Sequence, residues 1–401
     1  MVAQTPRVAY FPDSFHEVNG VAHTSRHFEA FAKRRNLPFL SVRAGNRPIS
    51  FEDSGNTCSL ELPRSLFSIP LEKDLSFDPS YVRHLPLMTR AIERFNPTLI
   101  HITGPSEIGF LGAVIAHHYG LPLAASWHTN VHEYAGRRAA GLLRRLPRQQ
   151  TLAVGRSIEK CALVIASEFY SWAQILFAPN PELCIALENA TGRPCRLMPR
   201  GVDSLLFGPG RRTRPENDAE FVLGYVGRLS VEKNVAQLVK IQRELEEAGH
   251  RRFRFLIVGH GAEEEWLRRS LQRAEFTGVL KGDALAKAYA DMDVFVFPSH
   301  TDTFGNVVLE ALASGVPAIV TPDGGPASIV RDGATGRIAP DVEFAQAIAE
   351  LIEEPELLRE MRRAARDYAL TASWDAVFDG VYAGYRSILR PRADNAELLQ
   401  A

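Results

Sequence analysis

The sequence predicts an α/β protein built from two parallel-sheet domains. Short apolar runs alternate with amphipathic segments from the first strand pattern, at 8–11, almost to the end of the chain. A polar segment rich in arginine and proline, 208–218, separates two halves that repeat this pattern. The 401 residues suffice for two separate cores. We expect domains over 1–205 and 219–373, and a closing segment over 374–401 that is mainly helical.

Composition narrows the class of protein. The chain is 45% hydrophobic and 23% charged, with a net charge of −1, so no global field favours nucleic acid as a partner. Its apolar runs are shorter than the ~20 residues that span a bilayer, and the start of the chain has no signal-peptide pattern. The four cysteines show neither metal-ligand nor disulfide spacing. We therefore expect a cytoplasmic protein with reduced thiols and no metal.

The first half places two candidate residues beside strand ends. Gly20 lies in the turn between the strand 8–11 and a helix predicted from about 24 to 33. This glycine is either a simple turn or a point where backbone approaches a ligand. His128 follows a strand at 123–127; a lone histidine is more often structural, but carboxyl ends of parallel strands favour chemistry. Further strands are predicted at 39–42, 99–102 and 163–167.

The segment 137–148 is strongly basic. Five arginines alternate with leucine and alanine and no acid: Arg137, Arg138, Arg144, Arg145 and Arg148. One interpretation is a solvated helix face. The other is an interfacial helix that meets anionic lipid headgroups or an anionic acceptor.

The second half contains the most informative stretch, 294–315. The buried strand 294–297 ends at Pro298, a polar loop carries Asp302, and a helix carries Glu310 in its first turns. Arg228 and Lys233 lie five apart after the strand 221–226. In one parallel sheet these residues meet at the carboxyl edge, where helix N-termini and two cations suit a pyrophosphate and carboxylates suit sugar hydroxyls. The alternative is two surface cations capping a helix and a solvated Glu310.

Asp291-Met292-Asp293 matches the D-x-D pattern that can hold a divalent metal. It follows a helix predicted at 284–292 and directly precedes the strand at 294–297. Both carboxylates therefore lie at the amino end of the sheet, away from the predicted crevice. We interpret the motif as a helix terminus and a solvated turn.

Several motifs together resemble a known family. The run F-P-S-H-T-D-T-F-G-N-V-V-L-E-A-L-A-S-G, with G-Y-V-G-R-L-S-V-E-K-N, V-G-H-G, R-G-V-D and E-V-N-G-V, is similar to family 4 of the retaining glycosyltransferases. It resembles in particular the bacterial GDP-mannose-dependent α-mannosyltransferases and the sulfoquinovosyl- and glucosyl-lipid synthases. The resemblance implies the GT-B fold: two Rossmann-like domains facing across a cleft, with the last helix returning to the first domain.

The resemblance also implies roles. Arg228 and Lys233 would bind the donor diphosphate, Glu310 the ribose, and Asp302 the transferred sugar, where relatives usually have glutamate. His128 would lie near the anomeric carbon, and Arg200 stands where many relatives have asparagine. The catalytic set would be His128, Arg228, Lys233 and Asp302. The nucleotide-sugar site would comprise Gly20, Arg200, Gly227, Arg228, Lys233, His260, Val279, Leu280, Asp302, Phe304, Gly305, Asn306 and Glu310.

The implied reaction is front-face transfer of a hexose, most simply mannose or glucose, from a GDP- or UDP-sugar without a cofactor or metal. The acceptor would be a lipid or a glycan, and the five arginines would allow peripheral contact with the inner face of the membrane. Two alternatives remain: a nucleotide-sugar 2-epimerase of the same fold, and a non-catalytic sugar-nucleotide-binding protein.

Overall fold

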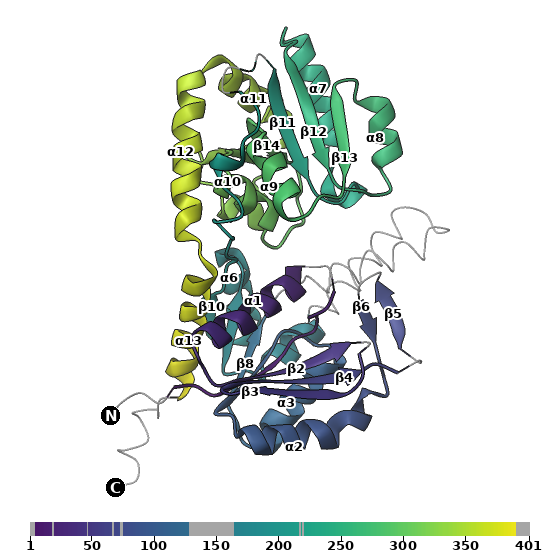
Figure 1. Ribbon diagram of the computed structural model, residues 1–401, viewed down its shortest axis with the longest axis vertical. Coiled ribbons are helices and arrows are strands. Elements are labelled where there is room, and N and C mark those ends of the chain that lie inside the picture. The colour runs from purple at the N-terminus through teal and green to yellow at the C-terminus, as the bar shows by residue number, and fades with distance from the viewer. Residues whose placement is uncertain are drawn as a thin grey trace. The chain divides into compact units, whose positions relative to one another are not determined.

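The computed structural model describes residues 5–17, 20–45, 47–65, 68–72, 75–127, 164–215, 218 and 220–389. The chain divides into two compact units: Met1–Pro199 with Val377–Ala401, and Arg200–Ala376. Each unit contains a twisted, largely parallel sheet with helices packed on it (Figure 1). The predicted α/β class is confirmed.

The sheet of the first unit has the order β10-β9-β8-β7-β1-β2-β4-β3 among the described residues. Its pairs are parallel except for β3 with β4. The strands and helices of this unit are β1 Val8–Phe11, α1 Gly20–Arg34, β2 Phe39–Gly45, β3 Ser50–Ser54, β4 Thr57–Pro63, the β5–β6 hairpin Ile69–Glu72 and Leu75–Phe77, η1 Tyr81–His84, α2 Leu85–Phe95, β7 Leu99–Ile102, α3 Glu107–His118, β8 Leu123–Ser126, β9 Ile175–Ala178, α6 Pro181–Thr191, β10 Cys195–Leu197 and most of α13, Trp374–Leu389.

The helix α13 packs on the first sheet through aromatic side chains. Phe378 stacks on Phe28 of α1 with 4.4 Å between ring centroids. The Tyr385 hydroxyl is hydrogen-bonded to Nδ1 of His101, whose Nε2 lies 3.0 Å from Ser126 Oγ. Burial lowers the pKa of His101 to about 3, so this imidazole is neutral in the folded protein.

The strand predicted at 163–167 is wrong. Residues 164–170 form a helix, and the strand beside β8 is β9, a fully buried Ile-Leu-Phe-Ala run. The side chains of Val164 and Ile165 are exposed, whereas Ala166, Phe169 and Tyr170 are buried, which is helical spacing. The β-branched pair Val164 and Ile165 suggested a strand, but the buried side chains recur at the 3.6-residue spacing of a helix.

The sheet of the second unit has the order β13-β12-β11-β14-β15-β16, and all its neighbouring pairs are parallel. The elements of this unit are η2 Pro209–Arg211, β11 Phe221–Val226, η3 Val231–Lys233, α7 Ala236–Glu247, β12 Phe253–Val258, α8 Glu264–Ser270, β13 Ala274–Gly278, α9 Gly282–Ala290, β14 Val294–Phe297, α10 Asn306–Ala313, β15 Ala318–Val320, η4 Gly325–Ser328, β16 Gly336–Ile338, η5 Asp341–Glu343, α11 Phe344–Glu353 and α12 Pro355–Thr371.

The helix α8 of this unit is short. It ends at Ser270, because Leu271 turns to an extended conformation and Ala274 already pairs with Phe255 of β12. The side-chain oxygen of Gln242 accepts hydrogen bonds from the backbone N–H groups of Gln272 and Arg273 at 3.1 and 3.3 Å. These bonds replace helical partners and let the chain enter β13 directly.

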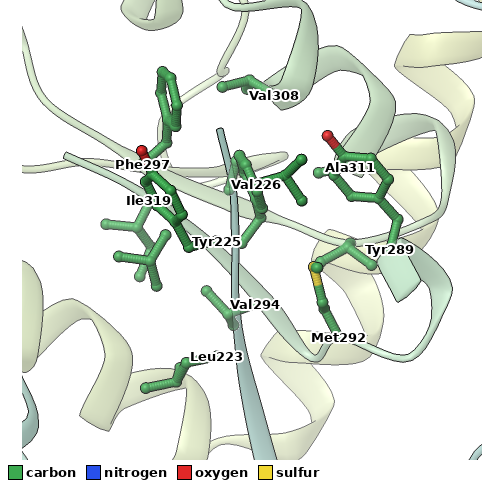
Figure 2. Packing of buried hydrophobic residues seen from close by; sticks show 14 of the residues in the cluster. Leu223, Tyr225, Val226, Tyr289, Met292, Val294, Phe297, Val308, Ala311 and Ile319 are labelled. Carbon is green, nitrogen blue, oxygen red and sulfur yellow. The ribbon is translucent and has the colours of Figure 1, made fainter. Parts of the chain in front are cut away.

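The core of the second unit lies around β11 and β14 (Figure 2). The side chains of Leu223, Tyr225 and Val294 are fully buried there. Met292 packs over β11 at Gly224, where an added Cβ would lie 1.9 Å from its sulfur. This packing fixes the two central strands against each other and so positions the loops at their carboxyl ends.

Candidate functional site

The candidate site lies where the strand order of the second sheet reverses. From β11 the chain proceeds outward through β12 and β13, then returns to β14 on the other side of β11. Helices that follow strands on the two sides of such a point cover opposite faces, which leaves a crevice at the carboxyl ends of the two central strands. Arg228 and Lys233 follow β11, and Asp302 follows β14.

Lys233 and Asp302 meet in this crevice. The ammonium Nζ lies 2.6 Å from Oδ1 of the carboxylate, and both side chains are about one-fifth exposed, at 22% and 20%. The other carboxylate oxygen, Oδ2, is buried and has no hydrogen-bond partner within the described chain. Buried carboxylate oxygens are usually hydrogen-bonded, so Oδ2 is an acceptor suited to a hydroxyl donor.

Two hydrogen bonds from the segment 321–325 fix the loop that carries Asp302. Thr321 Oγ1 donates to the Ser299 carbonyl at 2.7 Å, and the backbone N–H of Gly325 donates to the Asp302 carbonyl at 2.7 Å. A Cβ at Gly325 would lie 2.1 Å from the Thr303 carbonyl oxygen. The close approach therefore requires glycine and fixes the backbone of the Asp302 loop.

The helix α10 begins immediately after this loop. Gly305 has a φ of +96°, a conformation that favours glycine, and it provides no side-chain cap for the first turn, which starts at Asn306. The ring of Phe304 is buried and anchors the turn. The positive end of the helix dipole and its first N–H groups therefore face the same edge as Lys233.

Glu310 occupies an unusual environment on α10. Its Oε2 accepts a hydrogen bond of 2.8 Å from the hydroxyl of Tyr289 on α9. The residue as a whole is partly exposed, but its carboxyl group is enclosed by protein atoms. Burial raises the pKa of Glu310 to about 7, although the Tyr289 hydrogen bond opposes the rise. The interpretation of Glu310 as a solvated helix residue is therefore wrong.

Arg228 is more open. Its side chain is 62% exposed and lies 3.7 Å from the carboxylate of Glu232, while its carbonyl accepts a 2.9 Å hydrogen bond from the buried Tyr225 hydroxyl. The backbone is fixed and the guanidinium remains in solvent. Such a group can reorient toward a bound anion at little cost.

The loops after β11 and β12 pack tightly against each other. The N–H of Gly227 donates to the Val258 carbonyl at 3.0 Å. A Cβ at Gly259 would lie 1.9 Å from the Gly227 oxygen, and one at Gly261 would lie 2.1 Å from the Leu229 oxygen. These glycines allow two backbone loops to touch without side chains between them.

Three residues assigned to the nucleotide-sugar site, His260, Val279 and Leu280, follow adjacent strands. His260 is exposed and its Nδ1 is 2.5 Å from Oε2 of Glu264. Val279, which follows β13, is 65% exposed, and Leu280 packs partly on the core. The N–H of Gly259 donates to the Gly278 carbonyl at 2.9 Å and brings the two loops together.

Other predicted residues lie elsewhere. Arg200 begins the second unit and is 5% exposed. Gly20 is the exposed first residue of α1, in the first unit. His128 and the five arginines Arg137, Arg138, Arg144, Arg145 and Arg148 lie outside the described residues. Within the described residues, no helix combines the length and apolar character needed to cross a membrane.

The D-x-D motif lies where the sequence placed it, between α9 and β14, but the expected solvated turn is wrong for Asp293, which is buried. Asp291 accepts hydrogen bonds from Thr213, through its N–H at 2.7 Å and its hydroxyl at 2.6 Å. Asp293 pairs with Arg212 at 2.9 Å and Arg214 at 3.0 Å, and accepts the N–H of Val222 at 2.9 Å. These carboxylates link the segment that precedes β11 to the start of β14.

Two residues that shape the candidate site, Tyr289 and His300, were not identified from the sequence. Tyr289 is one helix residue among many until the fold places it against Glu310. His300 lies two residues before Asp302 and bridges Asp323 and Asp341, at 2.8 and 3.1 Å. The only available signal for His300 was its place in the loop, because its partners come from distant segments.

Known proteins are similar to this chain in sequence. The model of the family described as "Glycosyl transferases group 1" matches residues 210–368. A GDP-mannose-dependent alpha-mannosyltransferase of Mycolicibacterium smegmatis is 33% identical over 77% of this chain and 78% of its own length. The counterpart from Corynebacterium glutamicum is 28% identical over 96% and 89%.

Solved structures agree on the fold. Sucrose-phosphate synthase from Thermosynechococcus elongatus has a TM-score of 0.69 at 21% identity and covers 95% of this chain and 98% of its own. Anabaena HepE in complex with UDP has a TM-score of 0.64 at 17% identity and covers 95% and 100%. The predicted GT-B fold class, with two Rossmann-like units, is confirmed. The chain belongs to the group 1 glycosyltransferases, the family 4 retaining enzymes that its motifs resemble.

Proposed function

We propose that the crevice of the second unit binds a nucleoside-diphosphate sugar, GDP-mannose being the first candidate, and that the enzyme transfers the hexose to a lipid or glycan without a metal. The observation that carries this proposal is the meeting of Lys233 and Asp302 at 2.6 Å beside the N-terminus of α10. The names of the relatives from Mycolicibacterium and Corynebacterium support GDP-mannose.

The contacts suggest a division of labour among the residues. Lys233 and Arg228 neutralise the diphosphate, and the first N–H groups of α10 add donors to it. Asp302 accepts hydroxyls of the sugar through Oδ2, which is buried and has no protein donor within the described chain. Glu310, when ionised, accepts the hydroxyls of the ribose.

The reaction needs no protein nucleophile. In front-face substitution the bond between the anomeric carbon and the phosphate oxygen breaks as the acceptor oxygen approaches the same face. The departing phosphate oxygen takes the proton of the acceptor hydroxyl, and the negative charge that develops on the diphosphate is stabilised by Lys233 and Arg228. The family resemblance also assigns His128 to the catalytic set.

A donor panel tests the proposal. The wild type is incubated with GDP- and UDP-sugars, with and without EDTA, and the products are separated by chromatography. Slow donor hydrolysis that EDTA does not affect supports a metal-free transferase. An isomerised donor would instead identify a 2-epimerase, and binding without turnover a scaffold.

The Lys233→Ala variant then tests the site. We expect donor turnover to fall at least about a hundredfold, because a cation that stabilises the leaving group is lost. Lys240→Ala is the matched control, since Lys240 pairs with Glu244 at 3.7 Å on the surface of α7 in the same unit. Equal turnover in both variants would refute the assignment of Lys233.

The five arginines of 137–148 suggest peripheral contact with anionic membranes. Vesicles containing phosphatidylglycerol should bind the wild type more strongly than an Arg144→Ala/Arg145→Ala variant, and added salt should weaken the binding. Binding that is absent or independent of salt would remove this part of the proposal.

A further inference from the structure

His300 joins three loops at the edge of the proposed donor site. It lies on the β14–α10 loop, two residues before Asp302. Its Nδ1 is 2.8 Å from Oδ2 of Asp323, on the loop after β15, and its Nε2 is 3.1 Å from Oδ1 of Asp341, in η5. Its side chain is 38% exposed, so it remains accessible to solvent protons.

The same network reaches the segment carrying Lys233. Asn234, the next residue, adopts a left-handed conformation with φ +51° and donates from Nδ2 to Oδ2 of Asp341 at 3.1 Å. Gln237 donates from its side chain to the Asp341 carbonyl. Asp341 therefore forms an ion pair with the β14–α10 loop through Oδ1 and accepts a hydrogen bond from the residue after η3 through Oδ2.

We infer that His300 is a positioning residue for donor binding: by bridging Asp323 and Asp341 it holds the loops of Lys233 and Asp302 at the separation that the diphosphate sugar requires. This inference rests on the proposed function of those two residues. It adds a group that does not touch the donor in the proposed arrangement but sets the geometry of the groups that do.

Bridging depends on the charge of the imidazole. A protonated ring is attracted to both carboxylates: it is hydrogen-bonded to Asp323 through Nδ1 and ion-paired with Asp341 through Nε2. A neutral ring keeps only the hydrogen bond, so deprotonation removes one of the two links. The charged groups facing His300 from the packed elements are Asp323 and Asp341, and Asp302 on its own loop is paired with Lys233. Burial lowers the pKa of His300, but the two aspartates outweigh it and the net pKa is raised above 6.5.

The first test compares the binding of GDP and UDP by the full-length wild type and His300→Phe, using calorimetry at pH 6 and pH 9. At pH 6 the variant should bind about tenfold more weakly, the usual effect of one lost charged hydrogen bond. The gap should narrow as the pH is raised to 9, because the wild-type ring loses its proton with rising pH. His300→Arg, which keeps a charge that can span both carboxylates, should restore the binding at both pH values.

His250→Phe is the matched control. His250 lies at the amino edge of the same sheet, with its Nε2 3.4 Å from Glu353, so its loss removes a comparable pair far from the donor loops. Its nucleotide binding should equal that of the wild type. Equal binding by wild type and His300→Phe at pH 6, or an equal gap at both pH values, would overturn the inference.

Hydrogen exchange separates this inference from the proposed function. In the unliganded protein, amides of the segment 299–305 should exchange faster in His300→Phe than in the wild type at pH 6, and the difference should shrink at pH 9. If the wild type binds neither nucleotide and Lys233→Ala changes nothing, the proposed function fails, yet exchange still reports whether His300 holds the loop. Unchanged exchange at pH 6 rejects the role of His300.

Discussion

The buried carboxyl of Glu310 makes a strong prediction about stability. We expect Glu310→Gln to stabilise the second unit at alkaline pH. The pKa of this group rises from 4.5 to about 7 on folding. A group whose folded pKa is raised contributes stability below its unfolded pKa, and that contribution is lost as the pH rises through the folded pKa. The wild type therefore carries an increasing penalty between pH 4.5 and 7, which glutamine avoids.

The size of the penalty follows from the shift. A rise to about 7 costs about 3 kcal/mol at pH 8 and less than about 1 kcal/mol at pH 5. Glu310 as a whole residue is partly exposed, so the value at pH 8 is an upper limit. Since about 1 kcal/mol shifts the Tm of a unit this size by roughly 2–4 °C, the variant should melt up to roughly 6–12 °C above the wild type at pH 8.

Scanning calorimetry of the full-length proteins at pH 5 and pH 8 measures this difference. Glu350→Gln is a suitable control, because Glu350 pairs with Arg337 at 2.5 Å on the surface of the same unit. It should show no gain that grows with pH. If Glu310→Gln melts at or below the wild-type temperature at pH 8, or if its advantage is the same at both pH values, the burial argument is wrong. The stabilised variant should also bind donor more weakly, a stability–activity trade-off.

Three further predictions concern other parts of the fold. Asp293→Ala should cost about 3–5 kcal/mol, because it removes the carboxylate that Arg212 and Arg214 share at side-chain exposures of 14% and 9%; a Tm close to that of the wild type would contradict this. His101→Asn should make the first unit less sensitive to acid. In the wild type His101 has a pKa of about 3 when folded and 6.5 when unfolded, so the free energy of unfolding falls by about 3 kcal/mol between pH 7 and pH 4. Urea unfolding across this range measures the dependence of that free energy on pH, and equal slopes in variant and wild type would refute the prediction. Gly325→Ala should displace the Asp302 loop and weaken GDP or UDP binding about tenfold or more, whereas Gly380→Ala, where an added Cβ meets nothing within 4 Å, should bind normally; equal affinities would show that the loop can adapt.

The central strand, loop and helix of the second unit could be predicted from the sequence alone. The apolar run Val294–Phe297 is bounded by Pro298, and the apolar spacing after Gly305 is helical, so local signals and tertiary packing agree. The meeting of Lys233 with Asp302 followed from one topological rule about strand ends.

Other features could not be predicted, because their causes are not local. Val164 and Ile165 have strand-like side chains, and only the burial of the residues that follow identifies a helix. The environment of Glu310 depends on Tyr289, twenty-one residues earlier on another helix. The bridge made by His300 joins segments that approach one another only in the folded sheet.

The paired loops after β11 and β12 have a consequence for engineering. Gly259 and Gly261 leave no room for side chains, so a library that varies them will yield mostly misfolded protein. His260 and Val279, on the same edge, are exposed and can be randomised at little cost to folding. A search for variants with altered nucleotide selectivity should therefore leave the glycines unchanged and randomise His260 and Val279.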